Sequence, residues 1–466
     1  MAAKPPTSYL DQLAQDKRDF VAAVDAHTTR DWVVAVGNEA GDLDSLASAL
    51  AYAHFAAQRE PASSSRRFVP LILTARTDLH LRPENVLALE AAGVTSDLLV
   101  TIDDLPSASA SSSSTLAAGA SFALVDHNSL LAPFRSNPSD PSDPTDDARV
   151  ASIVDHHADE GRHLGATPRR IEVTGSCSSL VADHFLGTAA DGNVHGNLDV
   201  PTAVADLLLS SIMIDTRLKL VADGGKATPL DVSALHALLP LSSFATSSSV
   251  VNASSSSATD PPSPAALAAL KAHNDRLGHA KEDVAHLSAR DLLRRDYKEY
   301  LVSGVRYGLS TVPLPLSTLL DADPSTSLAP EDRVARLVEA TRSWMDEREL
   351  DMAGVLTSYV HVKRKSGKEG KHRRELALVL RGKAVRAHAL EGVFKALEGD
   401  AVLELKEWKD ASVYGVAEGG WKAGEGEGKD RWRIWQQGND RATRKQVAPS
   451  MKSAVEHAVG AEGDEA

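Results

Sequence analysis

Short β-branched runs alternate with Ala/Leu-rich helical patterns over the first half of the chain, and this alternation constrains the fold more than any other feature. Continuous apolar strands divided by helices indicate a mainly parallel sheet with helices on both faces. The sequence therefore predicts an α/β domain over residues 1–235. Its strand candidates are Val33–Val36, Val69–Leu73, Leu98–Thr101, Phe122–Val125, Ser152–Val154 and Arg170–Val173.

The pattern changes in the second half, where we expect a smaller α+β domain over residues 265–466. Long helical stretches at 265–296 and 330–350 are separated by strand-like runs. The segments "MAGVLTSYVHVKRK" and "RRELALVLRG" then read as paired strands joined by a basic turn. Residues 236–264 are expected to form a linker or low-complexity insertion, with the domain break between 222 and 264.

Three segments rich in Ser, Pro and Asp contain too few apolar residues to pack and are predicted to be insertions. They are 106–115, 136–147 and 247–264. A further segment, 363–374, is strongly basic. It is expected to be a solvated hairpin turn, with a landing surface for a long polyanion as the alternative.

Charge and cysteine content limit the class of protein. The formal net charge of −14 argues against a general nucleic-acid-binding surface, so an anionic substrate needs local positive charge or metal ions. The single cysteine, Cys177, excludes a disulfide framework and a thiolate metal site, and it is expected to be a small buried residue. With no signal-peptide core and no long apolar run, we expect a cytoplasmic protein that does not enter the membrane.

Acids, in two cases with histidines, follow three predicted strands and end a fourth apolar stretch at 207–216, which we group with the strands. The side chains are Asp42 with Asp44, Asp126 with His127 and Asn128, Asp155 with His156 and His157, and Asp215. Ligands bind at the carboxyl ends of strands in open α/β sheets, so these groups are expected to converge. A single Asp after a strand is usually a helix cap or turn residue, but four such ends in one domain favour a metal site.

The mixture of Asp and His ligands indicates which metals suit such a site. Unpaired carboxylates brought together repel one another, and divalent cations remove that conflict. Asp and His without Cys suit Mn²⁺ or Mg²⁺, with Co²⁺ or Zn²⁺ possible. Two ions sharing one carboxylate can activate a water molecule and stabilise a departing phosphate oxygen.

The order of these motifs resembles the DHH phosphoesterase superfamily. "GNEAGDLDS", "LVDHN", "IVDHH" and "MIDT" match its four motifs, and the closest branch is that of exopolyphosphatase and prune. This branch is similar to the family II inorganic pyrophosphatases, which have a histidine where this chain has Asn38. The segments "RRDYKEY" and "TRKQVAP" resemble the phosphate-binding segments of the second domain. The resemblance covers roughly 30–225 and 265–458.

The resemblance implies a ligand set for two metal ions. Asp42 and Asp126 bind the first ion, with Asn38 at the position of the pyrophosphatase histidine. The second ion is bound by Asp44, His156 and Asp215, and Asp126 bridges the two.

The resemblance also implies residues that act on the substrate. His157 faces the substrate phosphate as an acid or ligand, and it is grouped with Asp126 as catalytic. His127 and Asp155 orient the ligands from behind. In the second domain the phosphate-binding residues are Lys298, Arg444 and Lys445.

The function that these residues favour is a metal-dependent, monomeric exopolyphosphatase that releases terminal orthophosphate from inorganic polyphosphate by two-metal activation of water. The alternatives are an inorganic pyrophosphatase and a prune-like hydrolase of short polyphosphates or cyclic nucleotides. Asn38 argues against the pyrophosphatase. A prune-like interaction scaffold is the non-enzymatic alternative, against which the presence of His156 and Asp215 argues.

Overall fold

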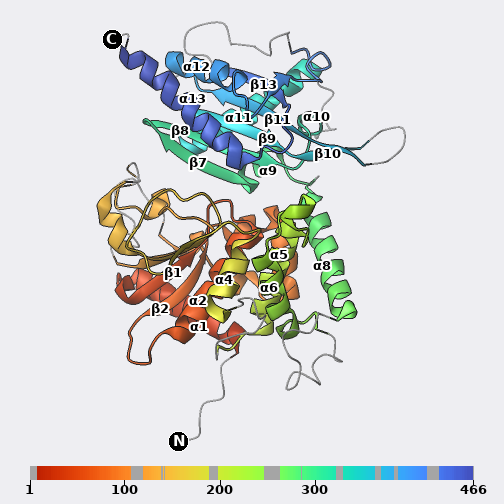
Figure 1. Cartoon of the computed structure of the whole chain (residues 1–466). Helices are drawn as coiled ribbons and strands as arrows, with labels where there is room; N and C mark the ends of the chain where they lie inside the picture. The colour runs from red at the N-terminus through yellow and green to blue at the C-terminus, as the bar shows by residue number, and fades with distance from the viewer. Residues whose placement is uncertain are drawn as a thin grey trace, which may run out of the picture. The chain divides into compact units, whose positions relative to one another are not determined.

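The computed structural model forms two compact units, Met1–Asp283 and Val284–Ala466 (Figure 1). The residues it describes are 8–106, 119–137, 140, 142–187, 198–245, 263–284, 286–321, 329–362, 369–382, 387–416 and 430–464. The predicted insertions 106–115, after Pro106, and 247–264, before Ser263, lie outside the described residues, as do 363–368 of the basic segment. The insertion 136–147 is described except at 138, 139 and 141, and leads into a 3₁₀ turn at Pro144–Arg149.

The first unit contains a six-stranded sheet in the order β3-β2-β1-β4-β5-β6, and every neighbouring pair is parallel. The strands are β1 (Trp32–Val36), β2 (Arg67–Ile72), β3 (Val100–Thr101), β4 (Ser121–Val125), β5 (Val150–Asp155) and β6 (Arg169–Ile171). All six predicted strands are thus confirmed. In this order β1, β4 and β5 are neighbours, so their carboxyl ends meet at one edge of the sheet.

Helices cover both faces of this sheet, as predicted. They are α1 (Tyr9–Asp25), α2 (Leu43–Arg59), α3 (Pro83–Ala91), α4 (Cys177–Leu186), α5 (Thr202–Thr216), α6 (Pro229–Leu238) and α8 (Pro264–Glu282). Alternation along β1 explains the two layers, because successive side chains of a strand point to opposite faces. Val34 packs in a cluster with Phe20 of α1, whereas Val33 and Ala35 pack in a cluster with α2, α4 and α5.

One element differs from the prediction. The stretch 207–216, which we grouped with the strands, is the second half of helix α5. A continuous apolar run has neither a period of two nor a period of 3.6, so the pattern alone does not separate a buried helix from a buried strand. Asp215 therefore lies in the last turn of a helix and not at a strand end.

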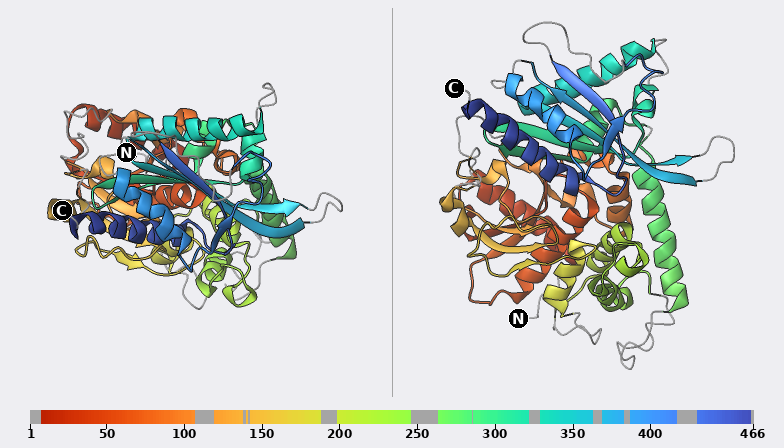
Figure 2. Two further views of the ribbon diagram at one scale, coloured as in Figure 1. Left: turned by 90° about the horizontal axis from the view of Figure 1, so that it is seen from above. Right: turned by 45° about the horizontal axis from the view of Figure 1, so that its top comes forward.

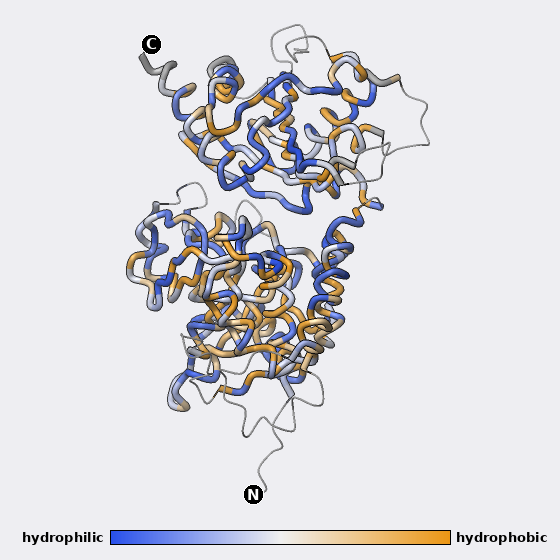
Figure 3. Tube along the Cα trace, turned by 45° about the vertical axis from the view of Figure 1, so that its right-hand side comes forward, coloured by the Kyte–Doolittle hydropathy of each residue, from blue (hydrophilic) through white to orange (hydrophobic). Residues whose placement is uncertain are grey.

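The division between the units lies after Asp283, later in the chain than the expected break between 222 and 264. The reason is α8, which packs on α3 and α5 of the first unit. Figure 3 shows the hydrophobic colour concentrated inside this unit, around the sheet and its packed helices.

The second unit is the predicted α+β domain. Its mixed sheet has the order β12-β13-β11-β9-β8-β7, with β10 paired to β11, and of these pairs β8 and β9 are parallel. The strands are β7 (Tyr297–Val302), β8 (Val305–Val312), β9 (Met352–Thr357), β10 (Tyr359–Val362), β11 (Glu369–Leu380), β12 (Leu405–Glu407) and β13 (Arg431–Gln437). The antiparallel pairs of β11 with β9 and β10 confirm the expected strand pairing around the basic turn.

The described helices of this unit are α9 (Ala289–Arg295), α10 (Leu316–Asp321), α11 (Pro330–Arg348), α12 (Ala387–Glu398) and α13 (Arg444–Asp464). Of these, α12 and α13 pack side by side on one face of the sheet, as the views of Figure 2 also show. Phe394 of α12 and Met451 of α13 share one apolar cluster with Tyr307 and Leu378 of the sheet. Within the described residues, no helix combines the length and apolar character that crossing a membrane requires.

Candidate metal centre

The loop after β1 supplies the first two acids of the site. Asp42 is the N-cap of α2, and its Oδ1 accepts a hydrogen bond from Ser45 N at 3.0 Å. Asp44 follows in the first helical turn and is 2% exposed. Gly37 is needed at this close turn, because a Cβ there would lie 2.5 Å from the Cβ of Ser45. The Asp42 carboxylate thus caps α2, and the Asp44 carboxylate is buried in the first turn of the same helix.

Asp126 follows β4 with a left-handed backbone, at a φ of 61°. Its N–H still donates to Val154 O of β5 at 3.1 Å, so the chain bends while it remains attached to the sheet. The side chain is almost fully buried. This conformation is costly for a residue with a Cβ and is found where the surroundings enforce it, often at functional sites.

The structure brings three of the predicted residues together in a compact cluster. His156 Nε2 lies 3.2 Å from Asp126 Oδ1 and 4.0 Å from Asp44 Oδ2. His157 Nδ1 lies 3.6 Å from the same Asp126 Oδ1. Asp126, His156 and His157 each offer a ligand atom within 4.8 Å of the others, which is the spacing of a metal site.

The orientation of His156 suits a metal ligand. Its Nδ1 lies 3.1 Å from the carbonyl oxygen of Thr174. A carbonyl only accepts, so Nδ1 carries a proton, and Nε2 points toward the two carboxylates, where it would offer its lone pair to a bound metal ion. Metal-binding histidines are commonly oriented by such a bond from the other ring nitrogen.

The charges around this cluster favour a cation. Burial, together with the neighbouring Asp126 carboxylate, raises the pKa of Asp44. A histidine nitrogen and two carboxylates that converge in a buried site are stabilised by a divalent ion. The donor set therefore fits a divalent metal ion, and which ion it is stays a prediction.

Serine residues and the start of α4 surround Asp44, which accepts five hydrogen bonds. Its Oδ1 accepts from the hydroxyls of Ser176, Ser178 and Ser211, at 2.7, 2.8 and 2.8 Å, and from Ser178 N at 2.8 Å. Its Oδ2 accepts from Cys177 N at 2.7 Å. The N-terminus of a helix favours a negative charge. We did not predict these contacts. The serine-rich run "GSCSS" was the sequence feature that could have indicated them.

Asn38 contacts Asp126 through its amide nitrogen. Nδ2 donates to Asp126 Oδ2 at 2.7 Å and to Asp126 O at 3.0 Å, while Oδ1 accepts from Ala40 N at 2.9 Å. The hydroxyl of Ser45 also donates to Asp126 Oδ2, at 2.6 Å. The backbone N–H of Ala40 fixes the amide orientation, because it requires an acceptor. In this arrangement Asn38 holds Asp126, and its metal-binding role stays a prediction.

Asp215 approaches the site from α5. Ser211, one helical turn earlier on the same face, contacts Asp44. Burial, with added repulsion from the nearby Asp44 charge, raises the pKa of Asp215 to about 7. A carboxylate in the last turn of a helix is also disfavoured by the helix dipole. A cation relieves all three effects, so Asp215 is suited to the ligand role predicted for it.

Asp155 orients His157. Its Oδ1 lies 2.8 Å from His157 Nδ1 and also accepts from the backbone N–H of His156 and His157, while Asn128 Nδ2 donates to Oδ2. Burial is the largest single influence and raises the pKa of Asp155, but the hydrogen bond and charge of His157, together with the bond from Asn128, lower the pKa overall. His127 lies behind the cluster with Nδ1 on Val125 O at 2.9 Å.

The predicted phosphate-binding residues all lie in the second unit. Arg444 begins α13 and forms an ion pair with Asp296 Oδ1 at 2.9 Å, with a second bond to the Asp296 carbonyl at 2.9 Å. This contact brings the start of α13 next to the start of β7, which carries Lys298. Lys445 is exposed beside Arg444. The second unit thus gathers the three predicted cations in one region.

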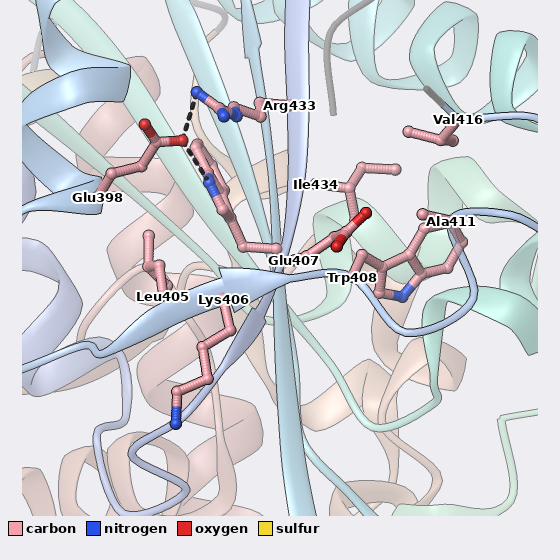
Figure 4. Close-up of a pocket in the computed structure, with 10 residues that line it drawn as sticks. Glu398, Leu405, Lys406, Glu407, Trp408, Ala411, Val416, Arg433 and Ile434 are labelled. Atoms are coloured by element: carbon pink, nitrogen blue, oxygen red, sulfur yellow. Dashed lines mark hydrogen bonds and ion pairs between the residues drawn. The ribbon is translucent and has the colours of Figure 1, made fainter. Parts of the chain in front are cut away.

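A cavity of about 240 Å³ in the second unit lies apart from all of the predicted residues (Figure 4). Trp408, Ile434 and Trp435 line it, and Glu398 accepts hydrogen bonds there from Arg433 and from Trp435 Nε1. The charges of Glu398 and Arg433 thus neutralise each other. Two glutamates, Glu398 and Glu407, line the cavity, but its lining includes no Asp or His like those of the candidate metal centre.

Known proteins share both halves of this architecture. The family model "DHH family, N-terminal domain" matches residues 32–212, and the "DHHA2 domain" model matches 275–454. A Schizosaccharomyces pombe protein named "Putative exopolyphosphatase" is 29% identical over 427 residues, 90% of each chain.

Animal relatives and a solved structure match over different shares. Human "Exopolyphosphatase PRUNE1" is 30% identical over 296 residues, which are 62% of this chain and 53% of that protein. The chain thus aligns with about half the length of its PRUNE1 relatives. The crystal structure of a Methanococcus jannaschii "putative family II inorganic pyrophosphatase" has a TM-score of 0.49 at 18% identity, covering 91% of this chain and 99% of that one.

The two family models follow one another in the predicted order and cover both units, and the "DHH" motif itself lies in the cluster of Asp126, His156 and His157. The chain belongs to the DHH phosphoesterase superfamily, in its exopolyphosphatase/prune branch.

Proposed function

We propose that this protein is a metal-dependent exopolyphosphatase that removes terminal orthophosphate from inorganic polyphosphate. Water adds to the terminal phosphorus, the bond to the bridging oxygen breaks, and the products are orthophosphate and a chain shorter by one phosphate. The broader assignment rests on the family: as a DHH phosphoesterase with exopolyphosphatase-named relatives, the chain is a phosphoanhydride hydrolase.

The observation that carries the proposal is the meeting of Asp44, Asp126 and His156 from three separate segments. Their ligand atoms lie 3.2 and 4.0 Å apart in a buried position, and the other nitrogen of His156 is held by Thr174. Divalent ions bound there would activate water and neutralise phosphate charge. We assign Asp44, Asp126, His156 and Asp215 to this role, together with Asp42 and Asn38.

His157 and Asp155 form the proposed acid pair. With Nδ1–H directed to Asp155, His157 presents its other ring nitrogen to the substrate. A protonated Nε2 donates to a phosphate oxygen and stabilises the charge that develops on the leaving group. Asp155 acts through His157 by fixing the ring and by stabilising its positive charge.

The second unit contributes phosphate-binding cations in this proposal. Arg444 offers a planar fork to two phosphate oxygens, and Lys298 and Lys445 act as point charges. A chain with a net charge of −14 needs such a local concentration of cations to bind a polyanion. We further propose Mn²⁺ or Mg²⁺ as the native metal, a monomeric state and a cytoplasmic location.

The test is phosphate release from polyphosphates of graded length, with Mg²⁺ or Mn²⁺, by the wild type and by Asp126→Ala. We expect release from medium-length chains to exceed release from pyrophosphate, and the variant to lose more than about 100-fold, beyond the usual effect of outer ligand partners. Equal release by the two proteins would falsify the proposal.

The same panel separates the alternatives. Preference for pyrophosphate indicates a pyrophosphatase, and preference for the shortest chains or for cyclic nucleotides indicates a prune-like hydrolase. An interaction scaffold predicts negligible turnover on every substrate and partner binding that persists in an Asp126→Ala, Asp215→Ala double variant.

A further inference from the structure

A second buried carboxylate, Asp231, lies behind the metal centre. It is the third residue of α6 and is fully buried. Its oxygens accept hydrogen bonds from Gly175 N at 2.9 Å, Ser176 N at 3.2 Å and the Ser179 hydroxyl at 2.6 Å. They also accept from Thr228 N and Thr228 Oγ1, at 2.6 and 2.8 Å.

Only part of this arrangement belongs to the cap of α6. In a capping box the third helical residue bonds back to the N-cap residue, here Thr228, and that contact satisfies the start of the helix. The donors from Gly175, Ser176 and Ser179 come from a different segment of the chain. Asp231 therefore ties the segment 174–179 to α6.

The segment that Asp231 fixes is the one that orients two predicted metal ligands. Thr174 provides the carbonyl that holds His156 Nδ1. Two residues further on, the Ser176 hydroxyl and Cys177 N bind the two oxygens of Asp44. A displacement of this segment moves a histidine and a carboxylate of the same cluster.

Close packing leaves this segment little freedom. A Cβ on Gly175 would lie 2.4 Å from Thr216 Cγ2 and 2.9 Å from Asp231 Oδ2. Thr216 is the residue after Asp215, so the segment also packs against the end of α5 that bears this predicted ligand. The absence of a side chain at Gly175 is what allows Asp231 to reach the backbone.

We infer that Asp231 is a positioning residue for the metal centre, acting through the backbone of 174–177 on His156 and Asp44. The inference rests on the metal centre of the proposed function and adds to it a residue that touches neither metal nor substrate. Outer partners of metal ligands commonly contribute 10–100-fold to metal affinity.

The test compares two variants of the full chain, Asp231→Asn and Thr228→Ala, by calorimetric titration with Mn²⁺ after removal of metal by a chelator. In Asp231→Asn the retained oxygen can still accept hydrogen bonds from Gly175 and Thr228. The new NH₂ group faces Ser176 N–H, and because both groups are donors, the segment is displaced. Thr228→Ala weakens the cap of α6 and leaves the three donors from 175–179 in place, which makes it the control for lost stability.

We expect Asp231→Asn to weaken Mn²⁺ binding about tenfold, and Thr228→Ala to stay within about twofold at a similar loss in Tm. Wild-type affinity in Asp231→Asn, or an equal loss in Thr228→Ala, overturns the inference. If Asp231→Asn does not fold, Gly175→Ala decides in its place, because its Cβ meets Thr216 Cγ2 and Asp231 Oδ2 and so displaces the same segment. Unchanged affinity there also overturns the inference.

Failure of the inference and failure of the proposed function give different results. A wild type that binds Mn²⁺ and releases phosphate, with an Asp231→Asn variant that binds Mn²⁺ equally well, overturns the inference alone. A wild type that binds Mn²⁺ but does not hydrolyse polyphosphate overturns the substrate, while the affinity ratio still decides the role of Asp231. A wild type that binds no Mn²⁺ overturns both.

Discussion

The acidic cluster of the first unit and the basic residues of the second unit are held in place very differently. Asp44 is buried among five hydrogen bonds, and Asp126 is held by Asn38 and Ser45. In the second unit Arg444 is held by Asp296, and Lys445 extends from the start of α13 into solvent. The fold thus arranges the predicted metal ligands in advance and leaves the predicted phosphate-binding cations nearer to water.

The difference follows from the chemistry of the side chains. A short carboxylate that is removed from water must receive hydrogen bonds or a cation, so its surroundings have to be prepared by the fold. Lysine and arginine keep their charge in water at the end of a long apolar stem. Changes in the acidic cluster should therefore alter metal affinity and folding, and changes in the basic region should alter substrate affinity.

The largest effect is expected for Asp215→Asn. With a weak amide in place of a carboxylate ligand, we expect Mn²⁺ affinity to fall about 100-fold, the upper end of the range for outer partners of metal ligands. Calorimetric titration of the chelator-treated protein measures this loss. A variant with wild-type affinity would remove Asp215 from the ligand set and leave a cluster built from strand ends alone.

The same variant has an opposite effect on the metal-free protein. Burial and the Asp44 charge raise the pKa of Asp215 to about 7, so the folded state binds more protons than the unfolded state between about pH 4 and pH 7. Ionisation of Asp215 therefore lowers the free energy of unfolding as the pH rises through this range. Asp215→Asn removes this unfavourable charge. We expect the variant to be about 1–2 kcal/mol more stable than the wild type at pH 8, after a discount for the partial exposure of Asp215.

Thermal denaturation at pH 8 and pH 4.5, in the presence of a chelator, checks the sign. The gain should shrink toward pH 4.5, where Asp215 is protonated in the folded wild type. A gain that is independent of pH would mean that the charge of Asp215 does not cause it. Addition of Mn²⁺ at pH 8 should reverse the order, because the wild type binds the ion more tightly.

Sequence patterns predicted the sheet and the motif residues of the site well. The six strands of the first unit and the meeting of Asp126 with His156 and His157 follow from apolar runs that end in acids. Parallel strands with neighbouring carboxyl ends leave those side chains few other places to lie. Asp215 was assigned to the wrong element, because a buried helix and a buried strand are both apolar throughout.

The supporting contacts could not be read from the sequence. Ser211 and Asp44 are far apart along the chain, as are Asp231 and Ser176, and only the folded backbone brings each pair together. Serine and aspartate near helix starts are common as caps, so their local pattern gives no sign of a longer-range role. The orientation of the Asn38 amide likewise depends on Ala40 and on Asp126.

A smaller effect is expected for Arg444→Ala. Loss of a forked, charge-assisted contact to phosphate should raise KM for polyphosphate about tenfold, while kcat changes less than about threefold. Steady-state kinetics over a range of salt concentrations measures both. A large fall in kcat at unchanged KM would place Arg444 in transition-state stabilisation and break the contrast between the two regions.

Asp296→Asn is the matched control for this variant. The Arg444 guanidinium pairs with the Asp296 carboxylate, and a phosphate chain has to compete with that pair. Removal of the charge with little change in shape should lower KM about two- to threefold, in line with the modest energy of partly exposed ion pairs. An increase in KM would show instead that Asp296 positions Arg444 for the substrate.

The smallest effect on metal affinity in this comparison is expected for Asn38→His, in which two influences oppose each other. An imidazole is a better ligand than an amide oxygen for Mn²⁺ and should tighten its binding and shift activity toward pyrophosphate. The amide nitrogen that donates to Asp126 Oδ2 is lost at the same time, which loosens the carboxylate that is predicted to bridge the two ions. We expect a net gain in Mn²⁺ affinity of about threefold, within the range of a single hydrogen bond. Asn38→Ala supplies the comparison, because it removes the donor and adds no ligand. If the two variants weaken Mn²⁺ binding equally, Asn38 serves the site only by holding Asp126, and the first ion is bound by Asp42 and Asp126 without it.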